Sequence, residues 1–422
     1  MRYLAAASLS ICLGSPALAQ SDASCQNSAD QAAADYNYVL GTQAIGGFYQ
    51  FSKQSALLEQ VMEIRGLGSN LMKLSLGRGS AARYGTGDAA GRARTTLQYL
   101  KTSPDLQQVF DMEIKYYQAW VHSFTAGDWR DGVSPKEARA YYDEMYELAA
   151  WLLTRYSGSG KVFMLGNWEG DWLLNGRGGR ESTPSMKAVE GMTDWLNIRQ
   201  KAIDDAKAAI SHENVELYHY VEVNLVEKAM AGKRSIARDV LPKANVDLVS
   251  YSSYEAIKKS QKPDLASIRE PLRKTVSYLE GQLQPKPGLP FERRVFIGEY
   301  GYHANKAKPQ TVKQQFLKSR YVMQVAIELD LPFALIWQLY NNEYATDGTS
   351  NEMSLIDESG QKRALYYLHR RYLEKMTEFV AESCRKTGKE PAREAFKGRA
   401  LEVLENATFG EMEQLAQQGV VE

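Results

Sequence analysis

Short apolar runs recur along the chain and alternate with longer amphipathic stretches. A run of about four to eight apolar or β-branched residues is typical of a buried strand, and apolar positions three or four residues apart indicate a helix. Strands are predicted at residues 38–44, 71–76, 116–123, 162–166, 215–222, 246–251, 295–299 and 333–339. The clearest helices are predicted at residues 53–64, 135–156 (with Ser134 as N-cap), 192–210, 265–283 and 311–329.

Eight strands that alternate with helices predict an α/β fold, the (β/α)8 or TIM barrel. A doubly wound sheet is the alternative. That fold needs a phosphate-binding glycine turn after its first strand, and residues 41–46 (Gly-Thr-Gln-Ala-Ile-Gly) match such a turn poorly. After the eighth strand, residues 364–379 predict another helix, and the remaining residues predict helices packed on the outside of the barrel.

The N-terminus has the pattern of a secretory signal peptide. Arg2 supplies a positive charge, residues 4–13 are apolar, and residues 17–19 (Ala-Leu-Ala) match a cleavage site. The apolar run is too short to span a bilayer, and no later segment is long and apolar enough. We therefore expect a secreted or periplasmic protein with no integral membrane segment after signal removal. The expected parts are a signal peptide at 1–19, the barrel at 20–380 and a C-terminal helical extension at 381–422.

Two cysteines, Cys25 and Cys384, remain once the signal is removed. Neither belongs to a Cys-x-x-Cys motif or lies beside a histidine, so a metal site is not expected there. In an oxidising compartment the two are candidates for a disulfide, with two buried free thiols as the alternative. The histidines form no His-x-His or His-Glu-x-x-His motif, and no metal or other cofactor is predicted.

The composition is that of a globular protein, with 44% hydrophobic and 24% charged residues. Lys and Arg number 51 and Asp and Glu number 51, so no long-range field steers nucleic acid to the protein, and no nucleic-acid partner is expected. The chain has 25 Tyr and 7 Trp. Rings in such number are what a carbohydrate-binding cleft would need, although cores use them too.

Two predicted strands end abruptly in a glutamate. The fourth continues as Gly166-Asn167-Trp168-Glu169, and the seventh as Gly298-Glu299-Tyr300-Gly301. Barrel enzymes carry their chemistry at the C-terminal ends of the strands, and the ends of strands four and seven face each other across the mouth. Two carboxyl groups about 5 Å apart are what a retaining glycosidase needs, one to attack the anomeric carbon and one to protonate the leaving oxygen.

This pattern resembles the clan A glycoside hydrolases, a superfamily of (β/α)8 barrels with an acid/base Glu after strand four and a nucleophilic Glu at the end of strand seven. The resemblance covers roughly residues 36–375 and is specific only on strands four, six, seven and eight. It implies that Glu169 is the acid/base and Glu299 the nucleophile, and that the partner is an oligo- or polysaccharide. In most of the clan Asn directly precedes the acid/base Glu, whereas here Trp168 separates Asn167 from Glu169.

Residues around the two glutamates are candidates for substrate binding. Trp337 fits the clan's Trp beneath the cleaved sugar, and Arg78 is the candidate for an arginine that keeps the nucleophile ionised. Tyr251 and Tyr254 lie where the clan often has an aromatic hydrogen-bonding partner. The full set of predicted substrate-binding residues is Asn167, Trp168, Trp337, Tyr251, Tyr254, His122, Glu222, Arg78 and Tyr302.

Several alternatives stay open at these strand ends. Asp171 shares the face of Glu169 on an extended strand and is an alternative acid/base. Glu222 either hydrogen-bonds a sugar, tunes the pKa of a catalytic group or is satisfied by a neighbouring Arg or Tyr. Asp247 starts its strand and is expected to serve stability. An aromatic group at these strand ends is expected to line a sugar cleft: Trp168, Trp172, Tyr300, Tyr302 and Tyr340.

The sequence therefore predicts an exported retaining glycoside hydrolase, with a raised pKa for Glu169 and a lowered pKa for Glu299. The alternatives are a non-catalytic carbohydrate-binding barrel, or a polysaccharide lyase or transglycosylase that uses the same cleft. The sugar, the linkage and the oligomeric state do not follow from the residues.

Overall fold

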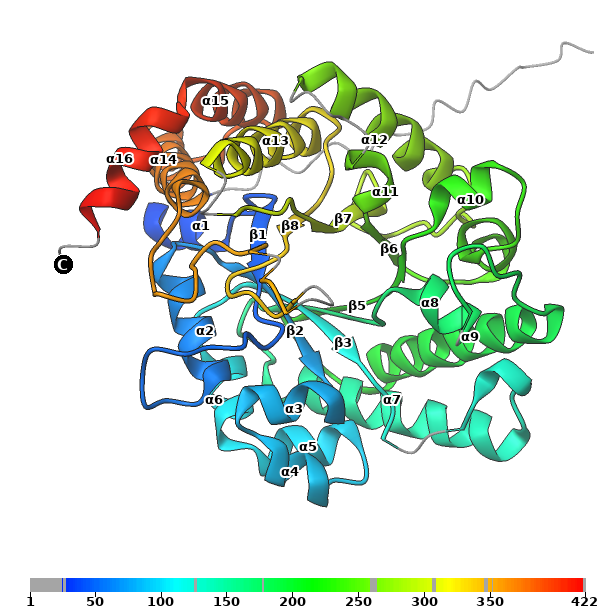
Figure 1. The fold of residues 1–422 in the computed structure, drawn as a ribbon. Coiled ribbons are helices and arrows are strands. Elements are labelled where there is room, and N and C mark those ends of the chain that lie inside the picture. The colour runs from blue at the N-terminus through cyan, green and yellow to red at the C-terminus, as the bar shows by residue number, and fades with distance from the viewer. Residues whose placement is uncertain are drawn as a thin grey trace, which may run out of the picture.

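A computed structural model describes residue 25 and residues 28–419, apart from 125–126, 177, 259–263, 306–308, 345–347 and 351. The predicted signal peptide lies outside the described residues. Eight parallel strands close into a barrel in sequence order, and helices surround it (Figure 1). The strands are β1 Leu40–Gln43, β2 Leu71–Leu76, β3 Tyr116–Val121, β4 Val162–Gly166, β5 Glu216–Val223, β6 Leu248–Ser252, β7 Val295–Tyr300 and β8 Ala334–Ile336. The predicted (β/α)8 fold is confirmed.

Each predicted strand is present, and the predicted ends differ most at β8. Residues 333–339 were expected to be extended, but the ladder ends at Ile336. Beyond it the Gln338 N–H donates to the carbonyl of Met353 and the Leu339 N–H to that of Gln43, so the backbone leaves β7 for new partners.

The helices begin at the caps that the sequence supplies. Ser134 and Glu137 form a reciprocal capping box at the start of α7. Helix α9 begins at Met186, before the predicted residue 192, because Ser185 caps it. The helices are α1 Ala29–Asp35, α2 Ala56–Gly66, α3 Arg78–Tyr84, α4 Gly87–Arg92, α5 Thr96–Thr102, α6 Pro104–Asp111, α7 Pro135–Arg155, α8 Gly170–Asn175, α9 Met186–Ala209, α10 Val226–Met230, α11 Tyr254–Ile257, α12 Leu265–Glu280, α13 Pro309–Glu328, α14 Ala364–Thr387, α15 Arg393–Asn406 and α16 Phe409–Gln418.

Two apolar cores hold the barrel together. The larger lies between the strands and the surrounding helices. The smaller fills the inside of the barrel, where Leu71, Met164, Tyr220, Phe296 and Leu335 from five strands pack together. Side chains alternate between the two cores along each strand. The filled interior leaves the polar chemistry to the C-terminal ends of the strands.

The C-terminal helices pack on one side of the barrel. Helices α15 and α16 contact α13 and α14, and in Figure 1 they lie at the outer edge of the molecule, beyond α13 and α14 as seen from the strands. The boundary expected after residue 380 falls inside α14, which continues to Thr387. Within the described ranges, no helix has both the length and the apolar content to cross a membrane.

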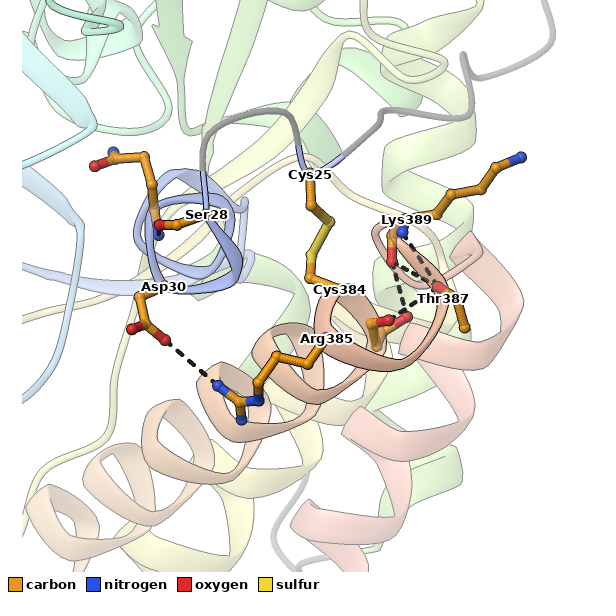
Figure 2. Close-up of a disulfide and its surroundings, with 9 residues drawn as sticks. Cys25, Ser28, Asp30, Cys384, Arg385, Thr387 and Lys389 are labelled. Atoms are coloured by element: carbon orange, nitrogen blue, oxygen red, sulfur yellow. Dashed lines mark hydrogen bonds and ion pairs between the residues drawn. A yellow bond between two sulfur atoms is a disulfide. The ribbon is translucent and has the colours of Figure 1, made fainter.

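A disulfide joins Cys25 to Cys384 on α14, with Cα atoms 5.7 Å apart, as Figure 2 shows. The N–H of Cys25 also donates to the carbonyl of Gly388, just beyond α14. Nearby, Asp30 on α1 forms an exposed ion pair with Arg385. The predicted pairing of the two cysteines is confirmed, and it fastens the start of α1 to the end of α14.

Candidate active site

The end of β7 contains an irregularity that directs Glu299 inward. Tyr251 of β6 pairs with Ile297 and Ser252 pairs with Glu299, so β7 holds one extra residue, Gly298. A Cβ atom on Gly298 would lie 1.7 Å from Ser250 Oγ and 2.9 Å from Glu222 Oε2, and only glycine fits. The bulge turns Glu299 into the mouth of the barrel, where its Oε1 lies 3.3 Å from Lys73 Nζ.

Glu169 lies at the end of β4, in the N-cap position of the short helix α8. Its Oε1 accepts a 2.6 Å hydrogen bond from the Ser252 hydroxyl, and its Oε2 accepts a 2.8 Å bond from the Trp172 indole. Ser252 is the register partner of Glu299 on the neighbouring strand. The structure therefore brings the two predicted glutamates to the same part of the barrel mouth, beside the ends of β6 and β7.

Lys73 and Glu222, from β2 and β5, connect the two glutamates from below, and both side chains are fully buried. Lys73 Nζ lies 2.7 Å from Glu222 Oε2. The other oxygen of Glu222 accepts the backbone N–H of Glu169 at 3.1 Å. Our sequence analysis missed Lys73, although a lysine inside the apolar strand at residues 71–76 is a signal, because a buried lysine needs a charged partner.

Burial controls the protonation of both glutamates at the mouth. It raises the pKa of Glu169 to about 7, and the Glu222 carboxylate adds to this effect, while the hydrogen bonds from Ser252 and Trp172 oppose it. The predicted rise for Glu169 is confirmed. Burial also raises the pKa of Glu299 well above its usual range, because repulsion from Glu222 and Glu169 adds to desolvation and the Lys73 ammonium offsets only part of it. The predicted lowering for Glu299 is wrong for this reason.

Asp171, the alternative acid, is fully engaged in holding the backbone. Its Oδ2 accepts the N–H groups of Asn224 and Leu225, and its Oδ1 accepts that of Ile236, each at 3.0 Å. Only about 1% of the residue is exposed. The carboxylate fastens α8 to the segments after β5, which leaves Glu169 as the carboxyl group of this segment at the mouth.

Three other predicted residues lie at or just beyond the ends of neighbouring strands, and one of them is close to the glutamates. Tyr254, on α11, is close enough that the Glu299 and Glu169 carboxylates help burial to raise the pKa of its phenol. Trp337 packs against Trp120 with ring centroids 6.0 Å apart. His122 is neutral at the end of β3, because burial and the Arg199 charge lower its pKa to about 4.

The residues next to Glu169 differ in exposure. Trp168 is 36% exposed at the rim. Asn167 is buried, and its Nδ2 donates to the carbonyl of Trp168 at 3.1 Å. Its Oδ1 accepts no hydrogen bond within the part of the chain that the structure describes.

Three predicted substrate-binding residues do not join the cluster. Tyr251 lies in the core between strands and helices, because Ser250 and Ser252 on either side of it face the barrel interior. The Tyr302 hydroxyl donates to the carbonyl of Ile257. Arg78 donates to the Ala93 carbonyl at 2.8 Å and stacks on Phe124, 4.3 Å from the ring centroid, while Lys73 provides the cation beside Glu299.

The five aromatic residues that were expected to line a sugar cleft lie in two different places. Trp168 and Trp172 lie at the mouth beside Glu169. Tyr300 and Tyr340 are buried in the outer core, and Tyr340 donates to Glu59. Of this expected group, Trp168 and Trp172 therefore lie beside Glu169, whereas Tyr300 at the end of β7 and Tyr340 after β8 belong to the outer core.

The remaining acids of the barrel fit structural roles. Asp247, before β6, accepts the N–H of His219 at 2.8 Å and pairs with Lys286 at 2.5 Å, as expected of a residue at the opposite end of the strands. Among the described residues there is no group of three or more His, Cys, Asp or Glu arranged to hold a metal ion.

Comparison with known proteins connects this chain to others by structure alone. No protein-family model matches the sequence, and no curated protein matches it. A solved structure of the GH5_18 protein of Streptomyces cattleya, in complex with Manb1-4GlcNAc, superposes with a TM-score of 0.50 at 12% identity, over 86% of each chain. The likeness to this protein shows a shared (β/α)8 fold, as the resemblance to clan A implied.

Two further solved structures have similar scores. A Bacteroidetes-affiliated GH5 cellulase gives a TM-score of 0.48 at 14% identity, over 92% of this chain and 98% of that one. Bacteroides uniformis beta-glucuronidase 2 gives a TM-score of 0.49 at 10% identity, over 81% of this chain and 35% of that chain. The chain thus spans about a third of that glucuronidase.

Proposed function

We propose that the protein is an exported retaining glycoside hydrolase that acts on an oligo- or polysaccharide. The observation that carries the proposal is the single hydrogen-bonded network that contains Glu169 and Glu299, which come from the ends of β4 and β7. Trp168 and Tyr254 beside the network offer ring faces on which a sugar can stack.

The two glutamates divide the chemistry between them. Glu299 attacks the anomeric carbon and forms a glycosyl ester as the bond to the leaving oxygen breaks, and Glu169 gives that oxygen its proton. In the second step Glu169 takes a proton from water, whose oxygen attacks the anomeric carbon and releases Glu299. A pKa of about 7 keeps Glu169 protonated in mildly acidic solution, as a general acid requires.

Export is supported by two independent features. The first residues have the composition of a signal peptide. The disulfide between Cys25 and Cys384 is a bond typical of oxidising compartments and rare in the cytosol.

The test is turnover on a panel of glycans by the wild type, Glu299→Gln and Glu169→Gln, with Glu113→Gln as a control at an exposed glutamate. We expect turnover in the wild type and control, and a loss of at least about 100-fold in kcat/KM in each of the two other variants. NMR of the first-formed product should show the anomeric configuration of the substrate.

Other outcomes would contradict the proposal in distinguishable ways. Inverted product would make Glu299 a general base, and turnover within a few-fold of wild type in Glu299→Gln would remove its assigned role. An unsaturated product would indicate a lyase, and a joined product would indicate a transglycosylase. Binding without turnover in the wild type would indicate a carbohydrate-binding barrel.

A further inference from the structure

We propose that Lys73 and Glu222 form a permanent ion pair that positions the reacting carboxylates, with the Lys73 ammonium shared between Glu222 and Glu299 so that Glu299 can ionise inside the barrel. The inference rests on the proposed function, because it assumes that Glu299 reacts as a carboxylate. Lys73 and Glu222 would be positioning residues, since neither faces the sugar directly.

The ammonium of Lys73 is fixed by its surroundings. It donates to Glu222 Oε2 at 2.7 Å, to Glu299 Oε1 at 3.3 Å and to the carbonyl of Gly298 at 3.3 Å, which uses its three protons. The indole of Trp120 covers it, with the ring centroid 4.3 Å from Nζ. A cation held in this way cannot turn toward water, so its charge acts on the two carboxylates.

Glu222 connects the cation to the acid/base. Its Oε2 accepts from Lys73 and from the Ser250 hydroxyl at 2.7 Å, and its Oε1 accepts the backbone N–H of Glu169. The 2.7 Å contact with the Lys73 ammonium makes Glu222 one half of a buried ion pair. One side chain therefore fixes the backbone of Glu169 and competes with Glu299 for the same ammonium.

The charge of the site is conserved during the proposed reaction. In the form of the site that reacts, the negative charge is on Glu299 and the proton is on Glu169 before attack. After attack Glu299 is a neutral ester, and the charge is on Glu169, whose proton has left with the alcohol. The Lys73–Glu222 pair is neutral in both states, so one negative charge passes between the two reacting groups while the pair is unchanged.

Few other charged groups face the pair. Tyr220 on β5 and Tyr254 on α11 stay neutral, because burial and the nearby carboxylates raise the pKa of each phenol. Arg199 approaches from α9, but its guanidinium donates to the carbonyls of Val121 and Gly166. Among the described residues, the cation that touches the glutamates is therefore Lys73.

The pH dependence of kcat/KM tests the proposal on the full-length protein. Replacing Lys73→Met should move the acidic limb of the profile up by about 1–3 pH units, because an opposite charge at this distance lowers a carboxyl pKa by about that amount. Lys73→Arg should keep the limb close to that of the wild type. Glu222→Gln should move it down, because Glu299 then has the ammonium to itself.

A matched control separates charge from packing. Gln118 is the register partner of Lys73 on β3 and is equally buried, so Gln118→Met disturbs the packing at the same level without changing charge. We expect its acidic limb to stay in place. A purely structural role for Lys73 would lower kcat/KM at all pH values and leave the limb unmoved in every variant, which would overturn the inference.

A titration that needs no substrate distinguishes failure of the ion-pair inference from failure of the proposed function. In protein labelled with ¹³C at the glutamate carboxyl carbons, the signal of Glu299 is the one lost in Glu299→Gln. Its midpoint should rise in Lys73→Met and fall in Glu222→Gln. If the midpoint moves and no glycan is turned over, the ion pair stands and the proposed function falls. If glycans are turned over and the midpoint does not move, the inference falls alone.

The double variant Lys73→Met/Glu222→Gln covers the case in which a single variant does not fold. It removes the pair as a neutral unit and does not leave Glu222 behind as an unpaired buried charge, so it should be more stable than Lys73→Met. Its midpoint for Glu299 should lie above that of the wild type and below that of Lys73→Met, because the lost attraction of Lys73 outweighs the lost repulsion of Glu222. A midpoint at or below that of the wild type would contradict the proposal.

Discussion

Replacement of Glu169→Gln should stabilise the fold in alkaline solution while it abolishes the proposed catalysis. Burial raises the pKa of this carboxyl from its ordinary 4.5 to about 7. The folded protein therefore holds the proton more tightly than the unfolded chain does, so its free energy of unfolding falls as the pH rises from 4.5 to 7. At about 1.4 kcal/mol per pH unit, the loss is about 3 kcal/mol once the pH exceeds 7.

Glutamine can keep both hydrogen bonds of Glu169. Its carbonyl can accept from the Trp172 indole, and its amide can donate to the Ser252 hydroxyl oxygen, which donates to Glu169 in the native protein. The stability gained by the variant should therefore come from removing a buried charge, and should grow by about 3 kcal/mol between pH 4.5 and pH 8.5.

Urea unfolding followed by circular dichroism, with the disulfide intact, measures this difference at the two pH values. Glu113→Gln, at a side chain that is 95% exposed, is the control and should show no such pH dependence. A stability difference that is the same at both pH values, or a variant less stable than the wild type at pH 8.5, would refute the reasoning from burial.

Three further predictions follow from the site. The kcat/KM of the wild type should fall as the pH rises through about 7, because Glu169 loses its proton there. A pH–rate profile measures this, and a plateau up to pH 9 would contradict the prediction. Trp168→Ala should raise KM about fivefold with little change in kcat, in steady-state kinetics on a glycan, because stacking on an exposed ring contributes about 1 kcal/mol. An unchanged KM would exclude a stacking role. Asp171→Ala should lower the free energy of unfolding by about 3 kcal/mol or more in urea titrations, because three buried N–H groups lose their acceptor. A loss below about 1 kcal/mol would show that these N–H groups find other partners.

The sequence predicts the strands well because their apolar runs are local features. Glu169 and Glu299 could be found for the same reason, since each follows such a run beside a glycine. Tyr251 was misplaced by a single step of the strand alternation, because a shift of one residue exchanges the two faces of a strand. The serines on either side of it are the residues that face inward.

The network beneath the mouth was beyond local reasoning. Lys73, Glu222 and Glu299 come from three strands separated by more than seventy residues of sequence at each step, and only closure of the barrel brings them together. Arg78 was a reasonable substitute in sequence, but it follows the end of β2, where helix α3 begins and its guanidinium reaches backbone carbonyls instead. The sequence signal for this cation was a lysine in the middle of the apolar strand β2, rather than a charged residue after its end.

The bond between Cys25 and Cys384 makes the polypeptide into a covalent ring that contains all eight strands, and its two closing residues are 359 positions apart in sequence. A protease that cuts one loop at the barrel mouth opens this ring but releases no fragment, since both pieces stay attached through sulfur. The nicked protein keeps its mass in a non-reducing gel and separates into two bands only after reduction. If the protein is exported as we propose, a first cut by an extracellular protease would therefore leave the two pieces joined. Refolding of the nicked molecule would remain a reaction within one molecule.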